Sequence, residues 1–180
     1  GRDINWDMNR LEGYRNFCNK LWNSFRLIKG LEVTDERNEY YSTYADQAHT
    51  WMEAKIASSI SLVNQHFDNF RISDALMELY KLTRDDFSGW YLEMIKPTYG
   101  DPIPQQDLGR AIGMFDAILR LLHPFMPFIT EELWQTLEER NDEFINKQDW
   151  PTYNEQTSPI HNNVFELISE IRAKRNENGI

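Results

Sequence analysis

The sequence predicts an all-α fold in which antiparallel helices pack as a bundle. Apolar residues recur at spacings of three and four over long stretches, which is the pattern of amphipathic helices. No stretch of useful length alternates apolar and polar residues as a half-buried strand would. Proline and glycine separate the periodic stretches and mark the places where helices end. Together these observations favour helices of about 20 residues joined by polar connections.

The expected helix boundaries follow from local signals. Gly30 closes the first helix, because glycine is common just past a helix C-terminus. Residues 31–43 are polar and irregular and are expected to form a loop. The third helix stops before Pro97, since the residue before a proline avoids the helical region. Thr130 is expected to N-cap a short fifth helix. The first four expected helices cover residues 11–30, 44–67, 72–96 and 106–122. A last amphipathic segment runs over 164–171.

Two regions are expected along the chain. Residues 1–141 are predicted to form the helical bundle, and residues 142–180 a polar extension followed by the start of a linker helix. The chain has 180 residues, of which 41% are hydrophobic and 27% charged, and this is a globular composition with ample length for a core. No apolar run reaches the roughly 20 residues of a membrane span, and no apolar leader opens the chain. With Cys18 as its single cysteine, the chain is expected to be a soluble cytoplasmic protein without an internal disulfide.

The charge distribution is uneven. The net charge is −10, which argues against a nucleic-acid binder because phosphate contacts need clustered lysine and arginine. Residues 1–30, however, carry six basic and three acidic side chains. An acidic body with a locally basic first helix is compatible with docking one RNA at one place.

No catalytic, cofactor or metal site is predicted within this chain. The sequence has no glycine-rich phosphate loop, no CxxC and no HExxH. The four histidines are scattered and are expected at the surface or at helix ends. The adjacent Asp85 and Asp86 would point about 100° apart on a helix, so they are expected on the solvated surface rather than as an acid–base pair.

The first expected helix has an unusual polar face. At 100° per residue, three asparagines and two arginines share an arc of about 100° opposite an apolar stripe. The stripe comprises Leu11, Tyr14, Cys18, Leu21, Phe25 and Ile28. Asparagine is a mediocre helix former, whereas its amide matches the edges of bases and arginine can stack on bases or clamp phosphates. The alternative is that these amides bridge to neighbouring loops or cap helix ends. Trp22 and Phe17 border the stripe and are expected to pack in the core or at its rim. The face comprises Glu12, Arg15, Asn16, Asn19, Asn23 and Arg26.

Three strings in the sequence resemble a known family. Arg10-Leu-Glu-Gly-Tyr-Arg-Asn-Phe-Cys-Asn-Lys-Leu-Trp-Asn23, opened by Gly1-Arg2-Asp3-Ile4, is similar to the start of the anticodon-binding domain of bacterial-type valine–tRNA ligases. Trp90-Tyr-Leu-Glu-Met-Ile-Lys-Pro97 resembles the third helix of that domain. His123-Pro-Phe-Met-Pro-Phe-Ile-Thr-Glu-Glu-Leu-Trp134 is similar to a corner shared by the class I ligases for valine, leucine and isoleucine. The first string favours valine within this group.

The resemblance implies a helical module that binds the anticodon stem-loop of a valine tRNA. Its parent enzyme joins valine to tRNA using ATP, and the ATP-binding, editing and C-terminal arm signatures are absent from this sequence. The implied partners are the valine tRNA and the catalytic domain of the same polypeptide, with no membrane and a monomeric state. The resemblance points first to Asn23, Asn19 and Arg15 as RNA-binding residues, then to Arg26, Asn16 and Lys20, with Lys20 suited to phosphate contact.

Other functions remain open at this stage. An acidic helical surface could serve as a protein–protein scaffold. Such a scaffold would show no salt-dependent affinity for RNA. The chain could equally be the corresponding domain of an isoleucine or leucine ligase. An independent helical enzyme is disfavoured because no nucleophile, base or metal cluster is visible.

Overall fold

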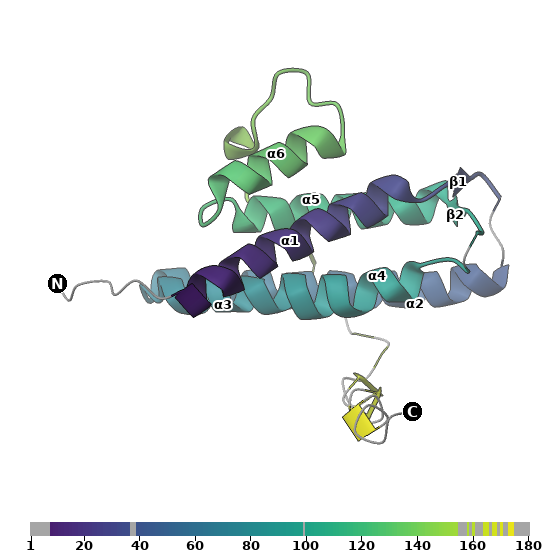
Figure 1. Ribbon diagram of the computed structural model, residues 1–180, viewed down its shortest axis with the longest axis horizontal. Helices are drawn as coiled ribbons and strands as arrows, with labels where there is room; N and C mark the ends of the chain where they lie inside the picture. Colours follow the sequence, from purple (N-terminus) through teal and green to yellow (C-terminus); the bar gives the residue numbers. More distant parts are fainter. Residues whose placement is uncertain are drawn as a thin grey trace.

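The computed structural model describes residues 8–36, 39–98, 100–154, 158, 160, 164, 165, 167, 168, 170, 173 and 174, and these residues form a helical bundle (Figure 1). The predicted all-α fold is confirmed. Its elements are α1 (Met8–Gly30), β1 (Val33–Thr34), α2 (Glu39–Asp68), α3 (Ile72–Lys81), the π-helical η1 (Leu82–Tyr91), α4 (Leu92–Ile95), β2 (Ile103–Pro104), α5 (Gln105–Leu122), α6 (Pro127–Leu137) and the 3₁₀ turn η2 (Ile145–Lys147).

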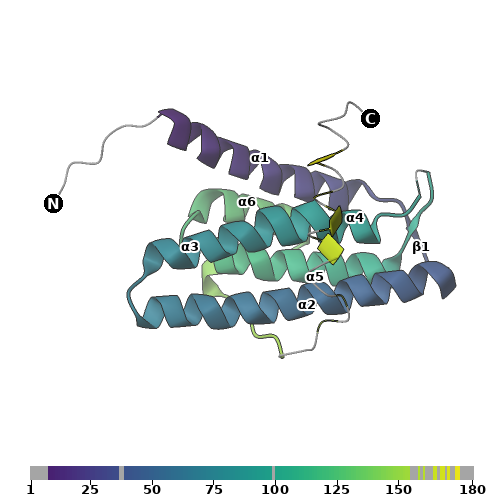
Figure 2. The same cartoon turned by 90° about the horizontal axis from the view of Figure 1, so that it is seen from below.

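The helices enclose one core. The helix α2 packs against α3 and η1, while α1 packs against η1 and α6, and α5 packs against α2 and α6 (Figures 1 and 2). Because α3, η1 and α4 follow one another without a break, they act as one long helix opposite α2. The largest fully buried side chains include Trp51 of α2, Tyr91 of η1, Phe115 of α5 and Trp134 of α6. Their burial supplies the main stabilising free energy of the bundle.

A two-residue parallel pairing ties two connections together, although the sequence shows no strand pattern. Val33 of β1 pairs with Ile103 of β2, and Thr34 pairs with Pro104. The Ile103 N–H donates to the Glu32 carbonyl at 2.8 Å, and the Ile103 side chain is fully buried. The pairing therefore anchors the segment after α1 to the start of α5.

Most expected helix boundaries are confirmed, but the loop after the first helix is shorter than expected. The helix α1 ends at Gly30, α5 ends at Leu122, and α4 ends one residue before Lys96. The expectation that residues 31–43 form a loop is wrong for its last part, since α2 begins at Glu39. The end of a helix needs no apolar side chains, so a polar composition alone does not separate it from a loop.

The expected N-cap role of Thr130 is wrong. The helix α6 begins at Pro127, and Thr130 lies inside it with its side chain buried. Its hydroxyl donates to the Met126 carbonyl at 2.8 Å and contacts His123 Nδ1 at 2.8 Å. Proline suits the first helical position, where its missing N–H costs nothing. The helix therefore starts at the proline, and the Thr130 hydroxyl connects the corner at His123 and Met126 to the helix.

The expectation of surface histidines is wrong for His49, which is fully buried in α2. Its Nδ1 lies 2.8 Å from the Tyr91 hydroxyl and its Nε2 lies 3.1 Å from Asp107 Oδ1. Both partners are also fully buried. The network joins α2, η1 and α5. Burial in a poorly solvated site lowers the pKa of His49 below 6.5, with a further contribution from the Arg110 charge.

Asp86 also departs from the expected solvated surface. Its side chain is only 14% exposed and lies 3.6 Å from the Lys55 ammonium of α2. Burial raises the pKa of Asp86, while Lys55 opposes that shift. Asp85 is exposed, as expected. The two neighbours thus occupy different environments, and Asp86 links η1 to α2.

Part of the predicted extension packs on the bundle. Ile145 of η2 is buried, and the Trp150 ring lies 6.1 Å from that of Phe67. The Phe165 ring lies 4.8 Å from those of Trp51 and Trp90. The division at residue 141 stays a prediction. The opening motif at residues 1–4 lies outside the described residues.

Replacing His49 by glutamine should weaken the dependence of stability on pH. Because the folded protein holds His49 at a lowered pKa, the unfolded chain binds more protons, so stability falls as the pH drops below 6.5. This loss should be smaller in His49→Gln, which has no titrating ring. Urea unfolding at about pH 7.5 and about pH 5.5 measures the free energy of both proteins. An equal loss in both would show that His49 does not contribute.

Candidate RNA-binding face

The helix α1 is attached to the bundle along one side. Phe17, Leu21, Phe25 and Ile28 are buried in the core. The predicted apolar stripe is therefore confirmed from Leu21 onward, but it is wrong for Leu11 and Tyr14, which are 39% and 58% exposed. The spacing of the four buried residues by three and four places them on one side of the helix. The opposite side of α1 therefore faces away from the core.

The six predicted RNA-binding residues lie on or beside this outward side. Arg15, Asn16, Asn19, Asn23 and Arg26 are exposed, and Lys20 is half-buried. Arg15 lies 3.7 Å from Glu12, but both side chains are more than 60% exposed, and such a surface pair contributes little to stability. Within the described part of the chain, no side-chain hydrogen bond or ion pair engages the other five. The structure thus brings the six residues onto one helix, while their role in RNA binding stays a prediction.

This placement bears on the alternative explanation for the asparagines. Amides that bridged to neighbouring loops or capped helix ends would show hydrogen bonds to those loops or ends. Asn16, Asn19 and Asn23 lie inside α1, away from both of its ends. None of their side chains is hydrogen-bonded to another described residue. Their donors and acceptors are available to a ligand.

A pair of buried hydroxyls fixes α1 against η1. Ser24 Oγ lies 2.7 Å from Ser88 Oγ, and both residues are less than 8% exposed. The Ser24 hydroxyl also donates to the Lys20 carbonyl at 3.0 Å. Small side chains at both positions let the two helices approach closely. The polar face of α1 is consequently held in a fixed position beside η1.

A groove of about 650 Å³ lies between α1 and the α3–η1 helix. On the α1 side, Asn16 and Lys20 line it. On the other side it is lined by residues that sequence reasoning did not select, because only the fold places them beside α1. The lining residues of the second side are Tyr80, Arg84, Asp85, Gly89 and Trp90.

The groove combines aromatic rings with positive charge. The Arg84 guanidinium lies 5.8 Å from the centroid of the Tyr80 ring, and that ring stacks on Phe17 at 4.8 Å. Arg84 also lies 3.8 Å from Asp85, with both side chains more than half exposed. Such a site suits an unpaired nucleotide, whose base can stack on a ring while its phosphate meets a cation.

The irregular backbone of η1 supplies most of the second side of the groove. Arg84, Asp85, Gly89 and Trp90 all belong to this ten-residue π-helical segment. π-helical turns are rare and are frequent at functional sites. A Cβ added at Gly89 would lie 3.2 Å from the Arg84 carbonyl oxygen, so a larger residue would press on the segment.

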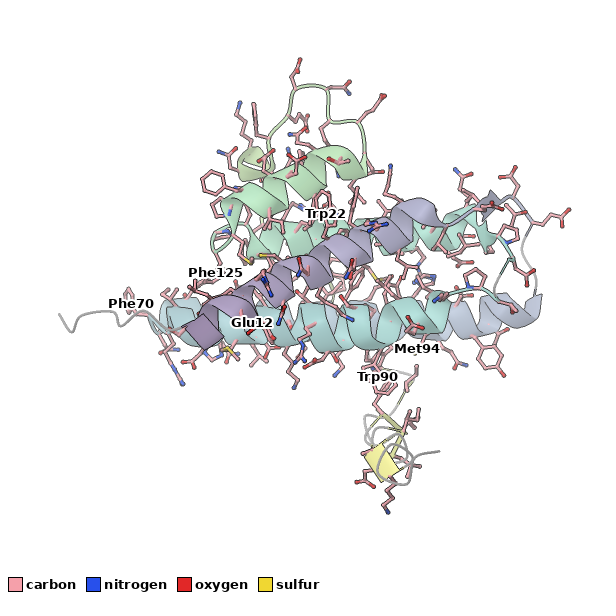
Figure 3. All side chains as sticks on the ribbon, viewed as in Figure 1. Glu12, Trp22, Phe70, Trp90, Met94 and Phe125 are labelled. Atoms are coloured by element: carbon pink, nitrogen blue, oxygen red, sulfur yellow. The ribbon has the colours of Figure 1, made fainter. Side chains whose placement is uncertain are left out.

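The two aromatics that border the stripe behave differently. Phe17 is buried in the core, as expected. Trp22 is 40% exposed, and its ring tilts against that of Phe25 at 5.6 Å. Figure 3 shows Trp22 on α1 beside α6, while Glu12 lies near the start of the helix. Trp22 therefore packs at the rim rather than in the core.

The described residues hold no group of three or more histidine, cysteine, aspartate or glutamate side chains that could bind a metal. Among the described helices, none combines the length and the apolar character that crossing a membrane requires.

A family model described as the anticodon-binding domain of tRNA ligase matches residues 49–180. This chain belongs to that family. The match begins within α2, so α1 lies outside it, and the anticodon-binding domain seen here carries its candidate face on a helix that precedes the matched residues.

Relatives of this anticodon-binding domain include valine–tRNA ligases. That of Phocaeicola vulgatus is 49% identical over 142 residues, which are 79% of this chain and 16% of the relative. That of Bacteroides thetaiotaomicron is 50% identical over 143 residues, with the same coverage. That of Christiangramia forsetii is 38% identical over 184 residues, which cover all of this chain and 21% of the relative. The chain therefore spans about a fifth or less of the length of these relatives.

Removing the hydroxyl pair should weaken the attachment of α1. In a double-mutant cycle, Ser24→Ala and Ser88→Ala should show a coupling free energy of about 0.5–1.5 kcal/mol, because they share one buried hydrogen bond. Urea denaturation of the two single variants and the double variant measures it. Ser61→Ala, at an exposed position of α2, serves as the control and should change stability by less than about 0.5 kcal/mol. If the stability losses of Ser24→Ala and Ser88→Ala simply added in the double variant, the two hydroxyls would share no stabilising hydrogen bond.

Proposed function

We propose that this domain binds the anticodon stem-loop of a valine tRNA through the outward side of α1 and the adjoining groove. Its parent enzyme is a ligase that attaches valine to this tRNA using ATP. ATP binding and catalysis belong to parts of the polypeptide outside this chain. The parent ligase acts as a monomer in the cytoplasm.

Two findings support the choice of ligand. The family match concerns anticodon-binding domains of tRNA ligases, and the relatives at 38–50% identity are valine–tRNA ligases. Anticodon bases stand in a single-stranded loop, where proteins read them by stacking and by hydrogen bonds to their edges. A surface that offers amides, guanidinium groups and aromatic rings matches this requirement.

The observation that carries the proposal is the availability of the α1 amides. Asn19 and Asn23 are exposed and lie four residues apart, so one helix turn separates them. Each amide presents a donor and an acceptor, which match the paired donor and acceptor at the edge of a base. Asn19 and Asn23 are assigned to base edges.

The charged residues of the face have a different role. Arg15 and Arg26 flank the asparagines along α1, and Lys20 lies at the edge of the groove. Phosphate contacts position an RNA without reading its sequence. Lys20 and Arg84, on opposite sides of the groove, are assigned to the backbone of the anticodon loop.

Replacing Asn23 by alanine should reduce affinity for the valine anticodon stem-loop by about 1–3 kcal/mol if the side chain reads a base. The change should also reduce discrimination against stem-loops with altered anticodon bases. Fluorescence titration of labelled stem-loops measures both. Asn64→Ala, at an exposed position of α2, is the matched control and should bind as the unaltered chain does.

Three outcomes of this titration separate the possibilities. Discrimination by anticodon that Asn23→Ala removes supports the assignment. Equal binding to all anticodons would leave phosphate contact alone and contradict base reading. Absence of salt-sensitive binding to any stem-loop would contradict the RNA-binding face and favour a protein–protein surface.

Replacing Lys20 by alanine should act on the salt dependence of binding rather than on sequence discrimination. A residue that neutralises one phosphate contributes about 0.7 to the slope of log affinity against log salt for single strands. Titrations at several salt concentrations measure that slope. The control is Lys147→Ala in η2, which should leave it unchanged. An unchanged slope in Lys20→Ala would remove Lys20 from the site.

A further inference from the structure

One aromatic side chain near the end of the chain packs on two helices of the bundle at once. The centroid of the Phe165 ring lies 4.8 Å from that of Trp51 in α2 and 4.8 Å from that of Trp90 in η1. The Phe165 and Trp51 rings are tilted by 35°, and the Phe165 and Trp90 rings meet edge to face at 63°. Edge-to-face contact is a favoured geometry for aromatic pairs. Phe165 therefore connects the two tryptophans.

The two tryptophans are held to different degrees. Trp51 is 1% exposed and belongs to the core, whereas Trp90 is half-buried. The Lys55 ammonium lies 5.6 Å from the centroid of the Trp51 ring and 3.6 Å from the Asp86 carboxylate of η1. The core and this ion pair fix α2 against η1 beside the aromatic cluster. Trp51 is thus a firm support for Phe165, and Trp90 is the ring whose position depends on Phe165.

Trp90 also lines the groove between α1 and the α3–η1 helix. Figure 3 shows its side chain pointing from this helix toward the yellow residues near the end of the chain. The other ring on this side of the groove, Tyr80, is supported by Phe17 of α1. The two rings therefore have separate supports, and that of Trp90 includes Phe165. Phe165 itself does not line the groove.

We propose that Phe165 is a positioning residue for the RNA-binding groove, where it fixes the Trp90 ring as a wall on which an unpaired nucleotide of the anticodon loop stacks. The inference rests on the function proposed above. Unpaired bases stack on aromatic side chains of RNA-binding proteins. Without Phe165, the Trp90 ring has more orientations, and ordering it on binding costs more conformational entropy. Phe165 thereby acts on the RNA without contacting it.

This role differs from that of the charged residues at the groove. Lys20 and Arg84 are assigned to phosphates, so removing either charge changes the salt dependence of binding. Phe165 and Trp90 carry no charge. Removing Phe165 should therefore lower affinity by a similar factor at every salt concentration and leave the slope of log affinity against log salt unchanged.

Stem-loop binding by the full-length ligase tests the role of Phe165. Phe165→Ala should lower affinity for the valine anticodon stem-loop about twofold to tenfold, the range that one aromatic contact contributes. Phe165→Tyr keeps the ring and should restore the affinity. The matched control is Phe67→Ala, which removes a half-buried ring that packs on Phe125 and Trp150 and does not line the groove. It should lower the melting temperature, as Phe165→Ala does, but leave the affinity unchanged.

A double variant shows whether Phe165 acts through Trp90. Trp90→Ala should itself lower the affinity, and adding Phe165→Ala should then cause no further loss. Additive losses would overturn the inference, as would unaltered affinity in Phe165→Ala or an equal loss of affinity in Phe67→Ala. If the unaltered ligase bound no stem-loop, the proposed function would fail and this inference with it. Unaltered binding in Phe165→Ala would overturn the role of Phe165 alone.

Discussion

The attachment of α1 along a single apolar stripe governs the rest of the structure. Burial of Phe17, Leu21 and Ile28 holds the helix on the bundle, and it also decides which side of α1 faces outward. The Ser24–Ser88 contact then brings α1 close to η1, so that a groove with two fixed sides lies between them. If α1 packed on the core through a different side, its asparagines would be buried or would face away from η1. In either case they would not lie beside the groove. Packing and the candidate function therefore depend on the same stripe.

The acidic net charge of the chain is compatible with binding one RNA. Screening limits electrostatic interactions between exposed charges to about 10 Å at moderate salt. The basic side chains of α1 therefore act on a ligand at their own face more strongly than the carboxylates of distant helices do. Asp86 is paired with Lys55, and Asp107 is buried with His49, so these two carboxylates contribute little charge to the surface beside α1. Local composition, rather than the net charge of −10, is the informative quantity.

Sequence reasoning predicted features that depend on local pattern and missed those that depend on three-dimensional neighbours. The buried part of the apolar stripe from Leu21 to Ile28, the end of α1 at Gly30 and the stop before Pro97 follow from periodicity and backbone preference. His49 was assigned to the surface because its partners Tyr91 and Asp107 lie 42 and 58 residues away. Tyr80 and Arg84 were not selected for the same reason, since only the packing of α3 and η1 on α1 gives them a role. Thr130 was misplaced because a proline and a threonine both signal a helix start, and the proline prevailed.

Tyr80 lies between two grooves of the domain. It lines both the groove beside the polar face of α1 and a second groove of about 450 Å³ between the first turns of α1, the helix α3 and the corner before α6, as do Gly13 and Phe17. The Tyr80 ring stacks on the buried Phe17 at 4.8 Å, and the Arg84 guanidinium lies 5.8 Å from its centroid. The position of this ring therefore depends on the same buried side of α1 that turns the asparagines outward. A substitution that loosened Phe17 would disturb the wall of the groove as well as the attachment of the helix.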